Sequence, residues 1–132
     1  MSDMVDRSRD WFRQAERDME QAALSRDAGH HEWCCFVSQQ AAEKAVKALH
    51  LARGQEVWGQ VVAKLIAELP AGEEVPADLP DKARILDAYY VAPRYPNGHP
   101  EGAPFEHYGK LHSDQAMEYA HEIIELVRSR LA

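Results

Sequence analysis

Apolar residues recur along most of the chain at intervals of three and four, which is the spacing of one face of an α-helix. This pattern predicts helices over residues 6–27, 32–53, 57–69 and 81–91, and a last helix that begins at Ser113. No stretch alternates convincingly between apolar and polar residues, as a half-buried strand would. We therefore expect an all-α fold, a compact antiparallel up-and-down bundle of about five helices.

The second predicted helix should lie at the centre of this bundle. Apolar side chains cover most of its circumference, which is typical of a helix surrounded by others. Because a neighbouring helix can approach small side chains closely, we expect one face of this helix to be closed against a partner. The small residues of that face are Val37, Ala41, Ala45, Ala48 and Ala52.

The other helices should complete the core with apolar stripes of their own. Ser113 is expected to cap the last helix, because a serine side chain at this position can accept a hydrogen bond from a free backbone amide. The stripe residues are Trp11, Phe12 and Met19 in the first helix, Trp58, Val61, Val62 and Leu65 in the third, Ile85, Leu86, Tyr89 and Tyr90 in the fourth, and Met117, Ile123 and Val127 in the last.

Composition is that of one globular domain, residues 1–132, with 45% hydrophobic and 28% charged residues. Every apolar run is far shorter than the ~18 residues of a membrane span. Residues 1–7 begin with acids and lack the apolar core of a signal peptide. Cys34 and Cys35 are neighbours without C-x-x-C spacing, so we expect two reduced thiols. These features predict a cytoplasmic protein that makes no membrane contact.

A net charge of −7 argues against a protein that coats nucleic acid without sequence preference, since such binding depends on many Lys and Arg residues. A local basic pocket is compatible with this charge. Any contact with nucleic acid should therefore depend on a few residues.

The stretch 92–112 contains four prolines and three glycines, which no regular helix would cross. A loop of this length in a small domain is usually functional or disordered. Three aromatic residues favour order: Tyr95, Phe105 and Tyr108. We therefore look for chemistry in this loop.

The sequence Tyr95-Pro96-Asn97-Gly98 predicts a β-turn, because proline suits the second position and asparagine the third. Such a turn brings the flanking Arg94 and His99 close in space. Arginine binds phosphate oxygens with two parallel hydrogen bonds, and histidine can exchange a proton near neutral pH. In the alternative, the arginine anchors loop carbonyls and the histidine is merely exposed. Spacing alone favours this second interpretation, since the pattern is short and common.

Two segments resemble the HEPN family, named for nucleotide binding in higher eukaryotes and prokaryotes. They are residues 39–49 (QQAAEKAVKAL) and 88–98 (AYYVAPRYPNG), within a resemblance that spans essentially the whole chain. The resemblance implies a compact helical bundle, usually a homodimer and often encoded beside a minimal nucleotidyltransferase. Several similar proteins, the HEPN toxins, are metal-independent endoribonucleases that use an Arg-x4-6-His motif. Here that motif would be Arg94 and His99.

Two positions depart from the active relatives. The motif arginine is followed by Tyr95 and Pro96, where a small or polar residue is usual. The third helix is preceded by Gly59-Gln60-Val61, where many similar sequences have Gly-His-Ser. The resemblance is therefore also compatible with a module that binds without cleaving.

We assign catalysis to Arg94 and His99, and nucleotide or phosphate binding to Lys44, Lys47, Arg94, Tyr95 and Asn97. For the two lysines there is a structural alternative. Glu43 and other acids would pair with them, and their aliphatic stems would lie on Trp33 and Leu51.

Seven histidines raise the question of a metal, but no complete ligand set occurs. Glu118 and His121 have the spacing of half a di-iron site, and no second such pair is present. We therefore expect no metal and no cofactor.

The leading hypothesis is a HEPN module that binds a nucleotide or RNA phosphate as partner of a nucleotidyltransferase or in a toxin–antitoxin-like system, with metal-independent RNase activity as an extension. The alternative is a non-catalytic interaction or dimerisation module that regulates a nucleotidyltransferase. A purely structural dimer is a third hypothesis.

Overall fold

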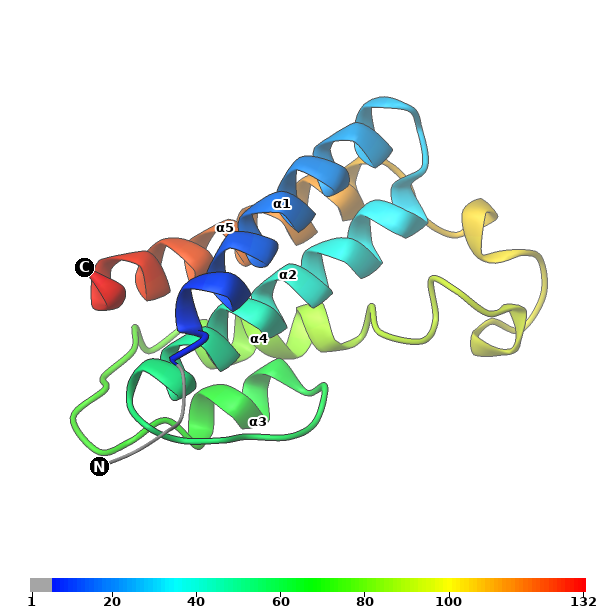
Figure 1. Ribbon diagram of the computed structural model, residues 1–132. Coiled ribbons are helices and arrows are strands. Elements are labelled where there is room, and N and C mark those ends of the chain that lie inside the picture. Colours follow the sequence, from blue (N-terminus) through cyan, green and yellow to red (C-terminus); the bar gives the residue numbers. More distant parts are fainter. Residues whose placement is uncertain (1–5) are drawn as a thin grey trace.

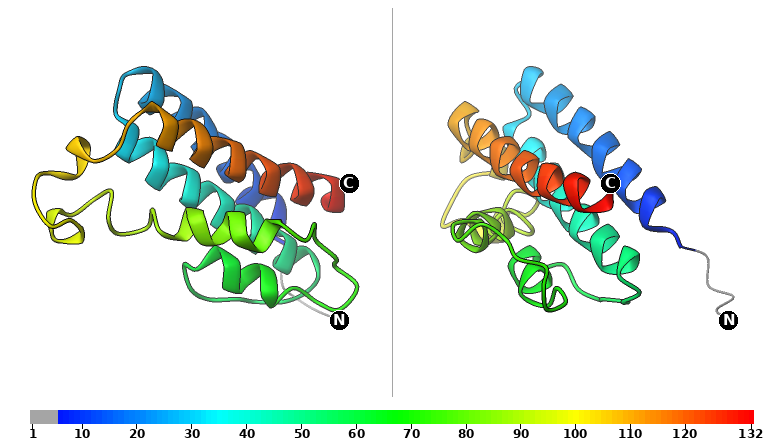
Figure 2. Two further views of the ribbon diagram at one scale, coloured as in Figure 1. Left: turned by 180° about the vertical axis from the view of Figure 1, so that it is seen from behind. Right: turned by 90° about the vertical axis from the view of Figure 1, so that its left-hand side faces the viewer.

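Three long helices form the frame of the molecule: α1 (Ser8–Asp27), α2 (His31–Ala52) and α5 (Lys110–Leu131). In the computed structural model, which describes residues 6–132, α1 and α2 run antiparallel and α5 packs along both of them (Figures 1 and 2). The short helices α3 (Val62–Ala67) and α4 (Leu79–Asp87) cover another side of α2. The described residues form helices, turns and loops without a strand, so the all-α prediction is confirmed.

The segment between α4 and α5 extends beyond the end of the three long helices (Figure 1). It contains two single-turn 3₁₀-helices, η1 (Pro96–Gly98) and η2 (Pro104–Glu106). Within residues 6–132, no helix has both the length and the apolar character needed to cross a bilayer.

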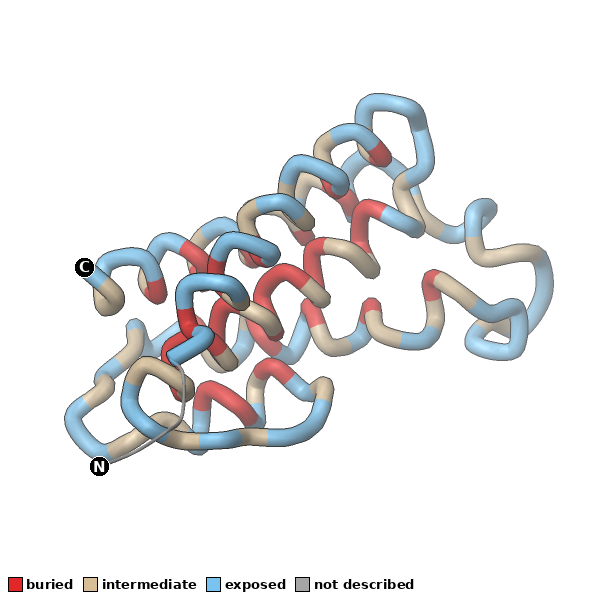
Figure 3. The backbone as a smooth tube through the Cα atoms, in the orientation of Figure 1, coloured by how far each residue is buried: buried red, intermediate tan, exposed pale blue. Residues whose placement is uncertain are grey.

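Helix α2 is central, as predicted, because it contributes to both parts of the core. On one side, Ala41, Ala45 and Ala48 are fully buried in a cluster with residues of α1 and α5. On the other side, Cys35, Ala42 and Val46 pack with residues of α3, α4 and α5. Figure 3 shows buried positions along nearly the whole length of α2. The small side chains thus permit close contact on one side while the opposite side anchors the short helices.

Helices α1 and α2 begin and end within two residues of the predicted positions, but the third helix does not. It begins at Val62 rather than at residue 57, and it ends at Ala67. Gly59 has a φ of 106°, which interrupts a helix at this point. Trp58 and Val61, predicted to be buried, are 84% and 50% exposed. The apolar residues before α3 therefore belong to a surface loop.

Two further boundaries were wrong. Helix α4 ends at Asp87, and turns continue to Arg94. Ile85, predicted to be buried, is 38% exposed. Helix α5 begins at Lys110, three residues before the predicted cap. Ser113 is buried in its first turn, where its hydroxyl donates to the Lys110 carbonyl and lies 2.8 Å from Nδ1 of His31. The serine therefore joins α5 to α2 instead of capping α5.

A polar network crosses the core between α2 and the short helices. Fully buried Gln39 donates from Nε2 to the carbonyl of Gln60 at 2.7 Å and to Oδ1 of Asp87 at 3.3 Å. The Asp87 carboxylate also accepts the backbone amides of Val62 and Ala63. These bonds satisfy the first free amides of α3, which in most helices are satisfied by a side chain at the helix's own N-terminus.

Candidate functional site

The loop after α4 is held in a fixed shape at the predicted turn. The Gly98 amide donates to the Tyr95 carbonyl at 3.3 Å, and the His99 amide donates to the Pro96 carbonyl at 3.0 Å. Gly98 also lies close to Ala92, because a Cβ atom added at Gly98 would be 3.0 Å from the Ala92 Cα. The turn predicted from the sequence is confirmed, and it folds back onto the chain that enters it.

Arg94 is held by aromatic side chains. Its Nε donates to the carbonyl of Tyr90 at 2.8 Å. Its guanidinium carbon lies 4.3 Å from the ring centroid of Phe36 on α2, 4.8 Å from that of Tyr90 and 5.3 Å from that of Tyr95. Cations at this distance are attracted by the ring faces. Within residues 6–132, the two terminal amino groups of Arg94 have no hydrogen-bond or ion-pair partner, and they keep their donors for a ligand.

His99 is positioned by the loop itself. Its Nε2 lies 2.8 Å from the Ala92 carbonyl. A carbonyl oxygen can only accept, so Nε2 carries a proton and donates, and in the neutral ring Nδ1 holds the lone pair. The ring stacks on that of His107, with centroids 4.2 Å apart and planes inclined by 2°. No partner of Nδ1 is found among residues 6–132. His99 therefore presents a free basic nitrogen from a fixed ring.

Tyr108 connects the histidines to the bundle. Its ring meets His99 edge-on at 5.6 Å, His112 at 5.4 Å and Tyr89 at 6.0 Å. Burial of Tyr108 raises the pKa of its phenol above the ordinary value of 10.0. His107 is held in turn, because its Nε2 donates to the Glu101 carbonyl at 2.5 Å. The ring of His99 thus rests on side chains that are themselves anchored.

Arg94 and His99 lie on either side of the turn, but they are held by different neighbours. Arg94 faces α2 and the aromatic rings, whereas His99 faces the second half of the loop. Within the described residues no hydrogen bond or ion pair joins the two side chains. A phosphate between them would accept hydrogen bonds from the free amino groups of Arg94, and from Nδ1 of His99 only when the imidazole is protonated.

Lys44 and Lys47 lie elsewhere, on the side of α2 that faces α1. The Lys44 ammonium is 2.5 Å from Oδ2 of Asp18, and that of Lys47 is 2.9 Å from Oε1 of Glu43. Lys47 also lies 5.7 Å from the ring centroid of Trp11. These contacts agree with the structural alternative of pairing with acids, although the aromatic neighbour is Trp11 rather than Trp33. Tyr95 lies beside Arg94, and exposed Asn97 lies in η1.

Sequence reasoning missed the residues that hold the two motif side chains. Tyr90 could have been found, because it precedes Arg94 by four residues in an aromatic segment. Phe36 and His107 could not have been found from neighbouring residues, because the fold alone brings them into contact with Arg94 and His99. As for metals, residues 6–132 contain no group of three or more His, Cys, Asp or Glu side chains that could hold an ion.

Comparison with known proteins places this arrangement in a family. The HEPN domain model matches residues 8–130. A Methanocaldococcus jannaschii protein named "Putative toxin MJ1304" is 28% identical over 130 residues, which cover 92% of this chain and 86% of that protein. The crystal structure of TT1696 from Thermus thermophilus matches with a TM-score of 0.93 and 43% identity, covering 96% of this chain and 99% of that one. The crystal structure of ST0689, an archaeal HEPN homologue, matches with a TM-score of 0.82 and 38% identity over 97% of this chain and 100% of that one.

The chain belongs to the HEPN family, and the resemblance seen in the sequence is confirmed. Its matched region contains the entire loop from Ala92 to Gly109.

Proposed function

We propose that the chain is the phosphate-binding HEPN module of a toxin–antitoxin-like system, and that the Arg94–His99 loop binds the phosphate of RNA or of a nucleotide. One observation carries this proposal. The two terminal amino groups of Arg94 and Nδ1 of His99, on either side of one turn, have no partner among residues 6–132. The toxin name of the relative from M. jannaschii supports the biological setting.

The same two side chains supply the groups needed to cleave RNA without a metal. The 2′-hydroxyl of one nucleotide attacks the adjacent phosphorus, and Nδ1 of His99 takes the hydroxyl proton. The terminal amino groups of Arg94 stabilise the negative charge that grows on the phosphate oxygens. The bond to the 5′-oxygen then breaks, and that oxygen takes a proton from water, to which protonated His99 returns the proton that it accepted. The products are a 2′,3′-cyclic phosphate and a 5′-hydroxyl end.

The protein acts as a homodimer in this proposal, so that two copies of the loop face one cleft. Large apolar side chains are exposed on and near the loop, and they would be covered by a partner copy. They include Trp33, Val91, Tyr95, Phe105 and Leu111. Sedimentation at micromolar concentration should therefore give a dimer. A monomer under these conditions would remove the shared cleft but leave phosphate binding by a single loop to be tested separately.

A second candidate function is the regulation of a partner nucleotidyltransferase without catalysis. It is favoured by the way Arg94 is already used, since its Nε donates to the Tyr90 carbonyl and its guanidinium carbon lies within 5.3 Å of three ring centroids. An arginine fixed in this way can recognise a phosphate or a partner carboxylate but has little freedom to follow a reacting group.

Cleavage of RNA by the purified protein in EDTA separates the two functions. If the loop is a nuclease site, His99→Ala and Arg94→Ala should both abolish cleavage while the fold is kept. Arg94→Lys should restore it only partly, because an ammonium group lacks the planar pair of donors. His121→Ala, which removes an exposed histidine of α5, is the matched control and should cleave normally.

Binding without cleavage gives a different set of results. RNA affinity would then fall in Arg94→Lys and Arg94→Ala but stay nearly unchanged in His99→Ala, and no product would form with the wild type. Equal RNA affinity in wild type, Arg94→Ala and His99→Ala would contradict the loop as a phosphate site.

A further inference from the structure

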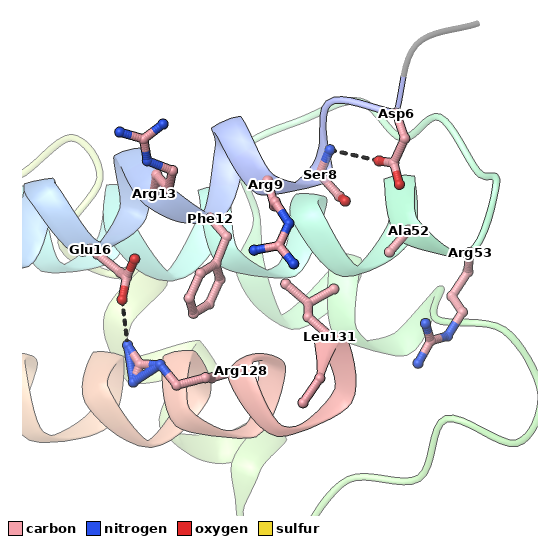
Figure 4. Close-up of a pocket in the computed structure, with 11 residues that line it drawn as sticks. Asp6, Ser8, Arg9, Phe12, Arg13, Glu16, Ala52, Arg53, Arg128 and Leu131 are labelled. Carbon is pink, nitrogen blue, oxygen red and sulfur yellow. Dashed lines mark hydrogen bonds and ion pairs between the residues drawn. The ribbon is translucent and has the colours of Figure 1, made fainter.

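A cleft lies between the first turns of α1 and the end of α5, where the last turn of α2 also reaches it (Figure 4). Its volume is about 540 Å³. Pockets that hold small ligands commonly measure ~300–1,000 Å³. The cleft is far from the loop, because Phe36, which contacts Arg94, and Ala52, which lines the cleft, are 16 positions apart on α2. That spacing corresponds to about 24 Å along the helix axis.

Charge in the cleft is opposite to that of the whole protein. The chain has 22 acidic residues and 15 Lys or Arg residues, whereas four arginines and two acidic side chains line the cleft. Both acidic side chains already have partners. The Asp6 carboxylate accepts the Ser8 amide at 2.8 Å, and the Glu16 carboxylate is 2.8 Å from Nη2 of Arg128. The Asp6 carboxylate keeps its charge, and acids already offset Arg53 and Arg128. The positive excess of the lining therefore comes from Arg9 and Arg13, which pair with no acid among residues 6–132.

Three of the arginines are placed to meet a ligand from different sides. Arg53 is paired with Glu73 and also donates to the Arg130 carbonyl, so its guanidinium is held in place. Arg128 is fixed by Glu16 from across the cleft. Arg9 forms no ion pair with any residue in the range 6–132. Arg13 has no such partner in that range either, but it points away from α5, so Arg9 is the arginine that offers its donors to the cleft (Figure 4). Arg9 lies one residue from the start of α1, where free backbone amides add positive potential.

Apart from Ser8, the other side chains of the lining are apolar. Phe12 is nearly buried and its ring centroid lies 5.3 Å from the guanidinium carbon of Arg128. Leu131 faces it from α5 in Figure 4, whereas Arg13 points away from α5. A cleft with arginines around an apolar base suits a ligand with one strongly anionic end and one less polar end.

We propose that this cleft is a second ligand site, which binds a nucleotide-sized phosphate ester with its phosphate against Arg9 and its less polar part against Phe12 and Leu131. Planar guanidinium groups match phosphate oxygens, and their hydrogen bonds to an anion are stronger than those between neutral groups. The site is independent of the Arg94–His99 loop and of any RNase activity.

Calorimetric titration of the full-length protein with ADP, adenosine and inorganic phosphate at low ionic strength tests the site. ADP should bind, adenosine should bind at least about tenfold more weakly, and phosphate should compete with ADP. Arg9→Gln should weaken ADP binding at least about tenfold, the loss expected for one charge-assisted contact. Arg17→Gln is the matched control, since Arg17 lies on the same helix outside the cleft and the variant has the same net charge. It should bind ADP like the wild type.

NMR chemical shifts test independently where ADP binds. ADP should shift the signals of Phe12 and Leu131, and Arg9→Gln should abolish these shifts without altering any shift of Tyr95 and His99. His99→Ala should leave the Phe12 and Leu131 shifts unchanged even if it loses RNA cleavage. Absence of ADP binding at millimolar concentration would overturn the proposal. So would equal weakening by Arg9→Gln and Arg17→Gln, equal affinity for adenosine and ADP, or shifts confined to the loop.

Discussion

The carboxylate of Asp87, at the end of α4, accepts a 2.7 Å hydrogen bond from the backbone amide of Val62, the first residue of α3. Its second oxygen accepts the amide of Ala63 at 3.0 Å. This is the function of an N-cap, performed by a residue 25 positions further along the chain. A helix of six residues is too short to be stable alone in water, so α3 depends on this contact and on its packing.

Replacement of this cap should loosen α3 in particular. We expect Asp87→Ala to lower the free energy of unfolding by about 1–2 kcal/mol, because two helix amides and the Gln39 side chain lose their acceptor. Chemical denaturation measures this loss, and hydrogen exchange at Val62 and Ala63 should become faster. Asp81→Ala removes an exposed carboxylate of the same helix and should change stability by less than about 0.5 kcal/mol. Similar losses in both variants would contradict the capping role.

A second prediction follows from the close contact of α2 with its neighbours. Ala45 is fully buried, in a cluster with Phe12 and Ile124, so Ala45→Leu should cost about 1–3 kcal/mol by overpacking. The melting temperature should fall accordingly. Ala67→Leu adds the same atoms at an exposed position of α3 and should be nearly neutral. An unchanged melting temperature in Ala45→Leu would mean that α2 has room on this face.

A third prediction concerns the loop and follows from the contact between Gly98 and Ala92. Gly98→Ala should force the turn away from Ala92, since the added Cβ would meet the Ala92 Cα at 3.0 Å. The hydrogen bond from His99 to the Ala92 carbonyl should weaken, and the ring signals of His99 should shift in NMR spectra. The bundle should keep its melting temperature to within a few degrees. Asn97→Ala, at the exposed neighbouring position, should leave the His99 signals in place. Unaltered His99 signals in Gly98→Ala would show that the turn can move without disturbing the histidine.

The fourth prediction concerns alkaline pH. Burial raises the pKa of the Cys34 thiol to about 11 and that of Cys35 to about 12, from an ordinary value of 9.0. Between pH 9 and 11 the unfolded chain therefore loses thiol protons that the folded chain keeps, and the free energy of unfolding falls as pH rises. At pH 10 the loss should be about 1 kcal/mol for each thiol.

Urea denaturation at pH 8 and pH 10 measures this fall. Replacement of both cysteines by alanine should make the fall smaller, although the variant starts from a lower stability because it has cavities. A fall of the same size in the variant and the wild type would assign the effect to other groups.

The long helices could be predicted to within three residues because their information is local. The stripes of α1, α2 and α5 repeat over five or six turns, and each repeat supports the same assignment. Helix α3 could not be predicted in this way. The apolar residues Trp58 and Val61 continue its pattern, but Gly59 breaks the backbone and the cap comes from Asp87. Periodicity contains no information about either effect.

The candidate site likewise has one part that the local sequence predicts and one part that depends on the fold. Proline, asparagine and glycine specify the turn between Arg94 and His99 locally, and the turn forms as predicted. The contacts of Arg94 with Phe36 and of His99 with His107 depend on how the loop returns to the bundle. Lys44 resembles a candidate phosphate ligand in the sequence because its partner Asp18 is 26 residues away on another helix.

The buried side chain of Gln39 has a consequence for the alignment of the helices. Apolar contacts alone would tolerate a slide of α2 by one turn, about 5.4 Å, because alanine follows alanine along its face. After such a slide the buried Gln39 amide would lose its acceptors, the Gln60 carbonyl and the Asp87 carboxylate, and a buried polar group left unpaired costs about 1–3 kcal/mol. The network therefore holds α2 at one position along its axis, and this fixes the distance between the two ends of the molecule.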